Sequence, residues 1–450
     1  MNERQTFLCG AIARQRALIL EVERYLWRHP ETGFREWNSH RYLKEKMEKL
    51  GFSVTEAGNI PGFYADFDTG RPGPRVLAMA ELDALLCPDH PEAVDGKAHA
   101  CGHNGQCAAL VGLAAALREP GAADGLFGSV RLMFVPAEEL IELEYREDLR
   151  RAGTIRWRTG KPEFLSRGMM DGCDMAFLFH GICDDSVDFA ARGGGNGCLT
   201  KSVVYRGKGS HAGAAPEKGI NALYAAALGM QAVNAVRETF ADKDHIRVHP
   251  ILTEGGSSVN IIPERARLES YVRGASLQAI LDASKKTDRA LAGAAVSLGA
   301  QVEVCDRAGY TPLHNDPTML SIVKRCMTAI SPSRRVRVDP SAWNAGSTDM
   351  GDLSAVMPVV HPYAAGASGS GHGTDYRIAD PERACVNSAK CQLLFLDALL
   401  SDDAKEARRV IARAKPPYPS KEAFLTALDA LQSDRSLVAY NGDGSVRISL

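Results

Sequence analysis

The sequence predicts an α/β protein in which a larger domain holds a mixed central sheet flanked by helices, and a smaller α+β domain is inserted into it. Residues 76–80 are fully apolar, and residues 130–135 are apolar apart from Arg131; both runs are typical of strands that are covered on both faces of a sheet. Residues 106–117, rich in Ala and Leu, are expected to form a helix between these strands. After three consecutive glycines at 193–195, the pattern is strand, helix, two strands, helix and strand. That order predicts a ferredoxin-like unit, a four-stranded sheet with two helices on one face.

The chain has 450 residues, which is too long for one ordinary hydrophobic core. We expect a discontinuous larger domain at 1–195 and 308–400, an inserted domain at 196–307 and a C-terminal extension at 401–450. The extension carries a basic amphipathic helix and then the run Tyr-Asn-Gly-Asp-Gly at 440–444, which is typical of a β-hairpin turn. Residues 140–168 are rich in Glu, Arg and Lys, and we interpret them as an inserted helix and loop, with a solvated surface excursion as the plain alternative.

Composition excludes several classes of partner. The net charge is -2, with 53 basic and 55 acidic residues, so no global field attracts nucleic acid or an anionic membrane. No apolar run reaches the roughly 18 residues that span a bilayer, and the N-terminus lacks a signal-peptide core. The 11 cysteines show no disulfide-like spacing, which favours free thiols in a reducing compartment. We therefore expect a cytoplasmic protein that binds neither nucleic acid nor membrane.

Cys101 and His103 lie two residues apart, just before the long apolar helix. Thiolate and imidazole are ligands that divalent transition metals accept. Several further metal-type residues follow apolar runs or lie in a Gly-rich loop: Asp83, Glu138, Glu139, His180 and His372. Because open α/β sheets gather chemistry at their strand ends, these positions predict one metal site built on loops.

Six motifs in a fixed order carry a resemblance to a known family. They are Ala-Glu-Leu-Asp-Ala-Leu at 80–85, His-Ala-Cys-Gly-His at 99–103, Pro-Ala-Glu-Glu at 136–139, Ser-His-Ala at 210–212, Asn-Ile-Ile-Pro at 260–263 and Gly-His-Gly at 371–373. Together they resemble the co-catalytic metallopeptidase and amidohydrolase family, which includes aminoacylases, auxin-conjugate hydrolases, aminobenzoyl-glutamate hydrolases and dipeptidases. The resemblance covers about residues 10 to 400. The run Gly-Ser-Thr-Asp-Met-Gly-Asp at 346–352 resembles most the aminobenzoyl-glutamate hydrolase and dipeptidase branch.

The resemblance implies a phosphorylase/hydrolase-like catalytic domain that binds one or two divalent ions, with Mn or Zn expected first and Co or Ni as alternatives. The implied ligands are Cys101, able to bridge two metals, and His103, Glu139, His180 and His372. Asp83 is implied to orient a ligand. Glu138 is implied as the general base, which takes a proton from the attacking water and passes it to the leaving nitrogen.

The resemblance also implies that the inserted domain is a lid or dimerisation domain. His211 is expected to reach a metal site, often that of the partner subunit, and to stabilise the oxyanion of the tetrahedral intermediate. Asn260 and Arg273 are the expected substrate-anchoring residues, since Arg suits a carboxylate. We expect a homodimer or a larger even assembly.

The sequence also departs from the family pattern beside the expected site. Asn104 and Gln106 stand where auxin-conjugate hydrolases usually carry Asp and His. The expected function is hydrolysis of a C–N bond in a small amide, an N-acyl amino acid, an aminobenzoyl compound or a dipeptide-like molecule. Two alternatives stay open at this stage: hydrolytic removal of a ring amino group from an aminobenzoate-type compound, and a non-catalytic binding relative.

Overall fold

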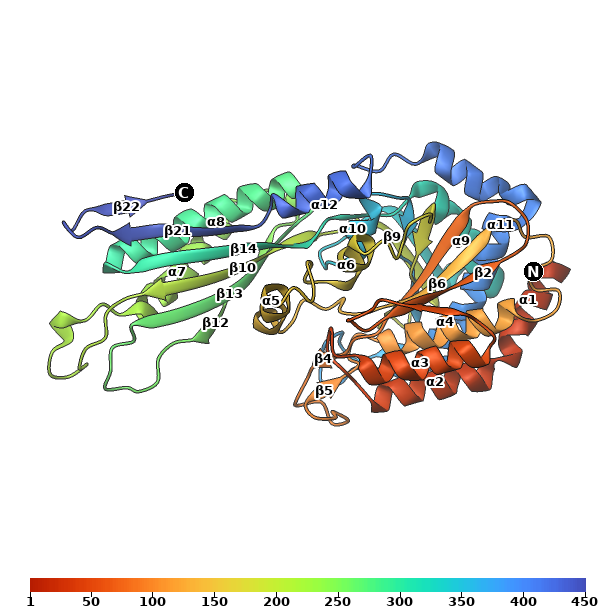
Figure 1. The fold of residues 1–450 in the computed structure, drawn as a ribbon, viewed down its shortest axis with the longest axis horizontal. Coiled ribbons are helices and arrows are strands. Elements are labelled where there is room, and N and C mark those ends of the chain that lie inside the picture. The colour runs from red at the N-terminus through yellow and green to blue at the C-terminus, as the bar shows by residue number, and fades with distance from the viewer. The chain divides into compact units, whose positions relative to one another are not determined.

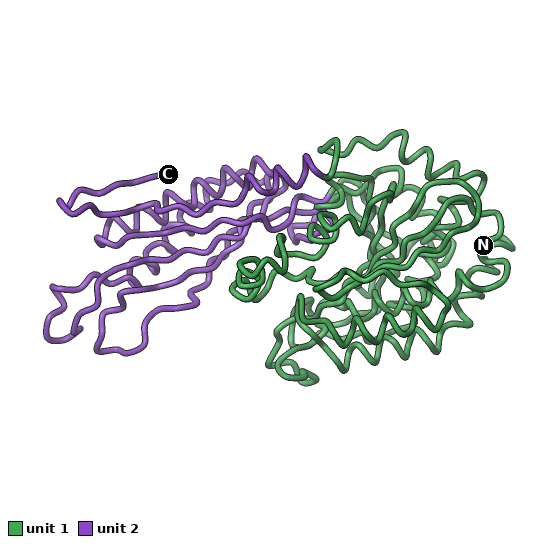
Figure 2. Tube along the Cα trace, viewed as in Figure 1, with its two compact units in different colours: residues 1–194, 314–343, 352–421 green, residues 195–313, 344–351, 422–450 purple.

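The computed structural model describes residues 1–450, which form two compact units (Figure 2). Unit 1 comprises residues 1–194, 314–343 and 352–421, and unit 2 comprises residues 195–313, 344–351 and 422–450. The first boundary lies in the run of glycines at 193–195. The tail is not a separate extension, because its first part belongs to unit 1 and its last 29 residues to unit 2 (450 less 421).

Unit 1 is built on a six-stranded mixed sheet with the order β1-β2-β6-β3-β7-β17 (Figure 1). Strands β3, β6, β7 and β17 run parallel, whereas β1 and β2 join the sheet antiparallel. The bounds are β1 (Val54–Glu56), β2 (Phe63–Asp68), β3 (Arg75–Glu81), β6 (Ser129–Val135), β7 (Met175–Phe177) and β17 (Val359–Val360). Every residue of β6 is buried, as its apolar run predicts, so the mixed central sheet is confirmed.

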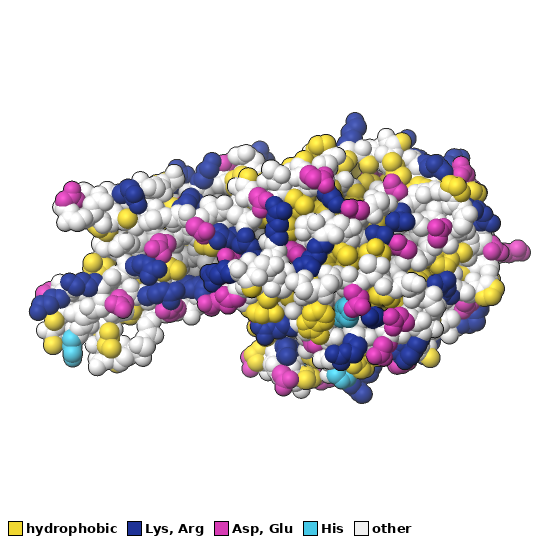
Figure 3. All heavy atoms as spheres, in the orientation of Figure 1, with side chains coloured by type: hydrophobic (Ala, Val, Ile, Leu, Met, Phe, Trp, Pro, Cys, Tyr) yellow, Lys and Arg dark blue, Asp and Glu magenta, His cyan; other side chains and the backbone are white.

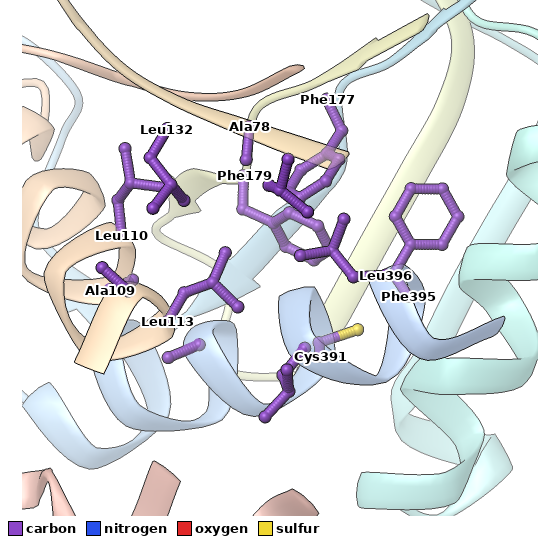
Figure 4. Close-up of a cluster of buried hydrophobic side chains, with 14 of the residues drawn as sticks. Ala78, Ala109, Leu110, Leu113, Leu132, Phe177, Phe179, Cys391, Phe395 and Leu396 are labelled. Atoms are coloured by element: carbon purple, nitrogen blue, oxygen red, sulfur yellow. The ribbon is translucent and has the colours of Figure 1, made fainter. Parts of the chain in front are cut away.

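The main helices of unit 1 are α1 (Glu3–Arg14), α2 (Arg16–Arg28), α3 (Trp37–Lys49), α4 (His103–Leu117), α9 (Pro317–Ile330) and α11 (Asn387–Arg413). All residues of α4 are buried, which explains its Ala- and Leu-rich composition. Figure 4 shows side chains of α4, α11 and the strands meeting in one apolar cluster, among them Leu110, Leu113, Phe177 and Phe395. This core anchors the N-terminal end of α4, where His103 begins the helix.

Shorter elements of unit 1 surround the strand ends. They are β4 (Leu85–Leu86), β5 (Lys97–Ala98), α5 (Leu143–Arg151), α6 (Gly160–Ser166), β8 (His180–Ile182), β9 (Phe189–Gly195), β16 (Val336–Asn344), β18 (Tyr363–Ala365), β19 (Ala367–Ser368) and β20 (Arg377–Ile378). Strand β18 pairs with β8 and β9, and β16 pairs with β9. Two short elements, β15 (Leu313–His314) and α10 (Met350–Ser354), each contain a point where the chain passes from unit 2 to unit 1.

Residues 140–168 contain inserted helical structure, as expected, but the alternative of a purely solvated surface excursion is wrong. The segment contains two helices, α5 and α6, and the side chains of Arg146 and Lys161 are fully buried. Arg146 donates to the main-chain carbonyls of Arg158 and Glu139, and Lys161 is paired with Glu81. These partners compensate for the lost hydration, so a charge-rich segment can be an interior one.

Unit 2 has a sheet with the order β11-β13-β10-β14-β21-β22, and β12 also pairs with β13. The bounds are β10 (Gly197–Arg206), α7 (Ala222–Arg237), β11 (Arg247–Val248), β12 (Ile251–Glu254), β13 (Arg265–Gly274), α8 (Leu277–Leu298), β14 (Gln301–Tyr310), α12 (Lys421–Asp429), β21 (Ser433–Tyr440) and β22 (Val446–Ile448). Residues along β13 alternate between buried and half-buried, since one face packs under α7 and α8.

The C-terminal hairpin extends the sheet of unit 2 beyond the predicted four strands. Strand β21 pairs with β14, and β22 pairs with β21. Arg435 of β21 binds Asp288 and Asp306, which also receive hydrogen bonds from the fully buried Lys201. The predicted turn at 440–444 is thus confirmed, and the charge network explains why the hairpin docks on β14.

Charged side chains of both signs are interspersed over the face drawn in Figure 3, in line with the near-zero net charge. None of the helices combines the length and the apolar composition that a bilayer crossing requires.

Candidate metal centre

The five predicted ligands lie together in unit 1. The Sγ atom of Cys101 is 3.3 Å from Nε2 of His180, and Nε2 of His372 is 3.2 Å from Oε1 of Glu139. Three overlapping triads have donor atoms within 4.8 Å of one another: Cys101, His103 and His180; Cys101, Glu139 and His372; and His103, Glu138 and Glu139. Cys101 belongs to two of these triads, an arrangement that suits a thiolate shared by two ions.

His103 is placed by the start of α4 and oriented by Asp83. Gly102 precedes the helix with φ of +84°, and a Cβ atom there would lie 2.2 Å from the hydroxyl oxygen of Tyr376. Glycine is therefore required at this position. Nδ1 of His103 lies 2.8 Å from the main-chain oxygen of Asp83 and 3.2 Å from its Oδ1. These acceptors fix the proton on Nδ1 and leave Nε2 for an ion.

His180 is held in the same tautomer by its own strand. Nδ1 donates to the main-chain oxygen of Gly181 at 2.8 Å, so the lone pair of Nε2 faces Cys101. Burial, followed by the neighbouring ring of His103, lowers the pKa of His180. A neutral imidazole with an available nitrogen is the form that binds metal.

The Glu138–Glu139 pair follows β6 on a strained turn. Ala137 has φ of +56°, and its N–H donates to Oε1 of the fully buried Glu36 at 2.8 Å. The N–H of Glu139 donates to Oδ2 of Asp83 at 2.9 Å, so one carboxylate positions both His103 and this turn. A non-glycine residue in the left-handed region is unfavourable and persists where its surroundings impose it, often at functional sites.

His372 also has a left-handed backbone, with φ of +64°. Its N–H donates to the main-chain oxygen of Ala100 at 2.9 Å, which ties the Gly-rich loop to the residue before Cys101. Although burial opposes ionisation, the ring of His372 lowers the pKa of Glu139 to about 2. Glu139 is therefore a carboxylate at neutral pH, as a metal ligand must be.

Two buried atoms of the site, Nε2 of His103 and Oε1 of Glu139, make no well-aligned hydrogen bond, although Oε2 of Glu81 and Nε2 of His372 each lie 3.2 Å from them. Burial opposes a charge on His103, yet the neighbouring Cys101 side chain and the Glu81 carboxylate raise the pKa of its ring well above 6.5. The surroundings thus stabilise positive charge at His103, and donor atoms without hydrogen bonds face one another. Both observations fit a site for divalent cations.

Four polar residues that were not among the expected site residues support the centre. Glu81 ends β3, and its carboxylate accepts from Lys161 at 2.6 Å and from Gln106 at 2.8 Å. Arg146 binds the main-chain carbonyl of Glu139. The apolar run that ends on Glu81 was a usable signal for that residue. No periodicity marks Arg146 or Lys161, since only the three-dimensional path of residues 140–168 brings them here.

His211, Asn260 and Arg273 lie in unit 2. The structure brings the first two together, because His211 forms an antiparallel bridge with Ile261 and the N–H of Ala212 donates to the main-chain oxygen of Asn260. Nδ1 of His211 accepts from the N–H groups of Gly213 and Ala214, so the ring proton is on Nε2. Arg273 lies at the far end of β13, opposite Cys198 in β10, and is not part of this pair.

Comparison with known proteins identifies a family for this chain. The model of peptidase family M20/M25/M40 matches residues 62–397, which include every predicted site residue. The chain is 28% identical over 416 residues to the Xaa-Arg dipeptidase of Mus musculus, covering 86% of this chain and 88% of that one. It is also 28% identical to one of the polypeptides of the p-aminobenzoyl-glutamate hydrolase of Escherichia coli, over 67% of this chain and 60% of that one.

Solved structures show the same fold. A dinuclear metal-binding peptidase of family M20 from Bacillus subtilis superposes with a TM-score of 0.64 at 22% identity, covering 86% of this chain and 98% of that one. An aminobenzoyl-glutamate utilization protein from Klebsiella pneumoniae superposes with a TM-score of 0.63 at 20% identity, covering 87% and 98%.

Proposed function

The chain belongs to peptidase family M20/M25/M40 and is a metal-dependent hydrolase of amide or peptide C–N bonds, and we propose that its substrate is a small carboxylate-bearing amide. The observation that carries this proposal is the buried Glu138–Glu139 pair beside three overlapping ligand triads. The matched relatives are named for an Xaa-Arg dipeptide, an N-acetylcysteine and p-aminobenzoyl-glutamate, which all place an amide beside a carboxylate. Arg273 is the proposed anchor for that carboxylate.

We assign the metal to Cys101, His103, Glu139, His180 and His372. Because Cys101 belongs to two of the triads, its sulfur would be able to serve two ions. Manganese or zinc suits this mixed set of sulfur, nitrogen and oxygen donors, and cobalt or nickel are alternatives. When bound, the ions supply Lewis acidity that brings the pKa of water from about 16 towards 7.

Glu138 is the proposed general base. Glu139 pairs with His372, and a carboxylate oxygen of Glu138 lies within 4.8 Å of donor atoms of His103 and Glu139, which is close enough to act on a water at the centre. The Glu138 carboxylate takes a proton from the attacking water and then transfers it to the nitrogen that leaves as the C–N bond breaks. The Nε2–H of His211 donates to the carbonyl oxygen as negative charge develops on it.

The assembly proposed is a homodimer through unit 2. Ten large apolar side chains on this unit are exposed, and six of them lie on α7, on β12 or in the loop that follows β12: Tyr224, Leu228, Ile251, Leu252, Val259 and Ile261. Tyr224 and Leu228 share one face of α7, and β12 forms an edge of the sheet. The opposite edge is the three-residue strand β22 of the C-terminal hairpin, and we propose that β12 is the edge that pairs with a second copy about a two-fold axis.

His211 lies next to this apolar surface, because it is bridged to Ile261. A two-fold contact there brings His211 close to the partner subunit, and we propose that it completes the partner's active site. All 11 cysteines are free thiols, which supports the proposal that the enzyme works in the reducing cytoplasm.

A substrate panel tests the proposal. Purified enzyme is freed of metal, reloaded with Mn²⁺, Zn²⁺, Co²⁺ or Ni²⁺, and given dipeptides, N-acyl amino acids, aminobenzoyl-glutamate and aminobenzoates. We expect metal-dependent release of an amine or amino acid from at least one amide carrying a free carboxylate. Ammonia release from an aminobenzoate with no amide turnover would instead favour the ring aminohydrolase, and inactivity with every metal would favour a binding relative.

A further inference from the structure

Lys161 is a fully buried lysine that reaches the metal centre from the segment 140–168. Its Nζ atom lies 2.6 Å from Oε1 of Glu81, and the side chains are 0% and 1% exposed. A buried ion pair of this kind carries a large desolvation penalty, and its removal on one side alone is strongly unfavourable. The pair therefore needs a role that a neutral, apolar pair would not fulfil.

The carboxylate of Glu81 lies beside Nε2 of His103, the nitrogen that would bind a metal ion. Its Oε2 accepts from Nε2 of Gln106 at 2.8 Å and lies 3.2 Å from Nε2 of His103. That nitrogen is the one left for an ion, since Nδ1 of the same ring is engaged by Asp83. Carboxylate oxygens bind zinc and manganese readily, so an unrestrained Glu81 is a competing ligand at His103.

The same segment supports the centre a second time. The fully buried Arg146 of α5 donates to the main-chain carbonyl of Glu139, while Lys161 of α6 binds Glu81. Arg146 thus fixes the main chain of Glu139, and Lys161 holds the carboxylate of Glu81. This repetition argues that the segment has a positioning role.

We propose that Lys161 is a positioning residue that keeps the Glu81 carboxylate out of the metal coordination sphere. With Glu81 bound to the Lys161 ammonium and to the Gln106 amide, a coordination position near His103 stays available to water. The inference rests on the proposed metal-dependent hydrolysis and assigns a function to the segment 140–168. It predicts that removing the ammonium adds a ligand to the metal.

The test uses Co²⁺ as the probe, because its visible absorption weakens as coordination number rises. Three variants are compared with the full-length wild type: Lys161→Met, Glu81→Gln and the double variant, in which no buried charge of the pair remains. The matched control is Lys201→Met in unit 2, which removes another fully buried lysine bonded to two carboxylates. Thermal melting reports the fold of each variant.

We expect Lys161→Met to weaken the Co²⁺ absorption and to bind Co²⁺ more tightly. We also expect kcat to fall about 10- to 100-fold, the usual effect of losing a group that orients a metal ligand. The double variant should recover the wild-type spectrum, since an amide is a poor metal ligand. Glu81→Gln alone should keep the wild-type spectrum. Lys201→Met should lower the melting temperature and leave the spectrum unchanged.

An unchanged Co²⁺ spectrum in folded Lys161→Met overturns the inference. Should that variant fail to fold, Glu81→Gln decides, because a changed spectrum there means that Glu81 is already a ligand in the wild type. The inference is also contradicted if the double variant does not recover the wild-type Co²⁺ spectrum. Failure of the wild type to bind Co²⁺ stoichiometrically overturns the proposed function itself, which separates the two failures.

Discussion

The imidazole of His103 is held by both oxygen acceptors that Asp83 offers it, the main-chain oxygen at 2.8 Å from Nδ1 and Oδ1 at 3.2 Å. The other carboxylate oxygen of Asp83 accepts the N–H of Glu139. One buried aspartate thus orients a nitrogen ligand and the loop that carries an oxygen ligand.

Replacement of Asp83 by Ala should weaken metal binding about 10- to 100-fold, the typical effect of losing a residue that orients a ligand. Equilibrium dialysis with elemental analysis measures the change. Asp66→Ala is the control, since Asp66 forms an ion pair with Arg131 on β6. Equal affinity in Asp83→Ala and wild type would refute the orienting role.

Removal of two ligands, Cys101→Ala with His103→Ala, should abolish stoichiometric binding of divalent ions. These residues contribute to all three triads, and Cys101 is the proposed shared ligand. Isothermal titration with Mn²⁺ and Zn²⁺ on metal-free protein gives the stoichiometry. Binding of one or two ions per chain by the folded double variant would show that the centre lies elsewhere.

Glu138→Gln should retain the fold and the metal but lose rate by about 10²- to 10⁴-fold, the range for loss of a general acid–base group. The amide cannot accept the proton from water. Glu139→Gln should behave differently and lose metal, because its carboxylate is the proposed ligand. Full activity in Glu138→Gln, together with metal retention in Glu139→Gln, would mean that the two roles are wrongly assigned.

Mixing of two inactive proteins tests whether His211 acts across a dimer. His211→Ala subunits lack the oxyanion donor and Glu138→Gln subunits lack the base, so a hybrid dimer contains one intact composite site. We expect partial recovery of activity once subunit exchange is shown by mass spectrometry of tagged proteins. Verified hybrids that stay inactive, or an active monomer, would exclude action in trans.

Acid should destabilise the metal-free protein through His361. Burial lowers the pKa of this side chain from 6.5 to about 3, while its Nδ1–H is bound to the carbonyl of Leu178. The unfolded chain takes up this proton at higher pH than the folded chain. Stability from the neutral ring is therefore present above pH 6.5 and is lost as pH falls towards 3.

The expected slope from this one group is about 1.4 kcal/mol per pH unit inside that window. Urea unfolding of wild type and His361→Gln at a series of pH values measures it. The variant should show a shallower decline between pH 6.5 and 3. Parallel curves for the two proteins would contradict the assignment.

The main outline of this protein could be predicted from its sequence. The apolar runs at 76–80 and 130–135 became β3 and β6, and the glycines at 193–195 mark the boundary between the units. Cys101, His103, Glu139, His180 and His372 converge as expected, because parallel strands deliver their following loops to one edge. The roles of His211, Asn260 and Arg273 stay predictions.

The sequence by itself determined the residue types of the centre and the strand-end positions that carry them, because apolar periodicity and ligand chemistry are local properties. Only the tertiary structure decided how charge is compensated around that centre. Lys161 follows Glu81 by 80 residues, and Arg435 lies in the tail, yet each reaches a buried carboxylate. A charged residue has the same local pattern whether it is solvated or paired inside the protein. Its burial is fixed by partners that are remote in the chain, and these become visible only once the chain is folded.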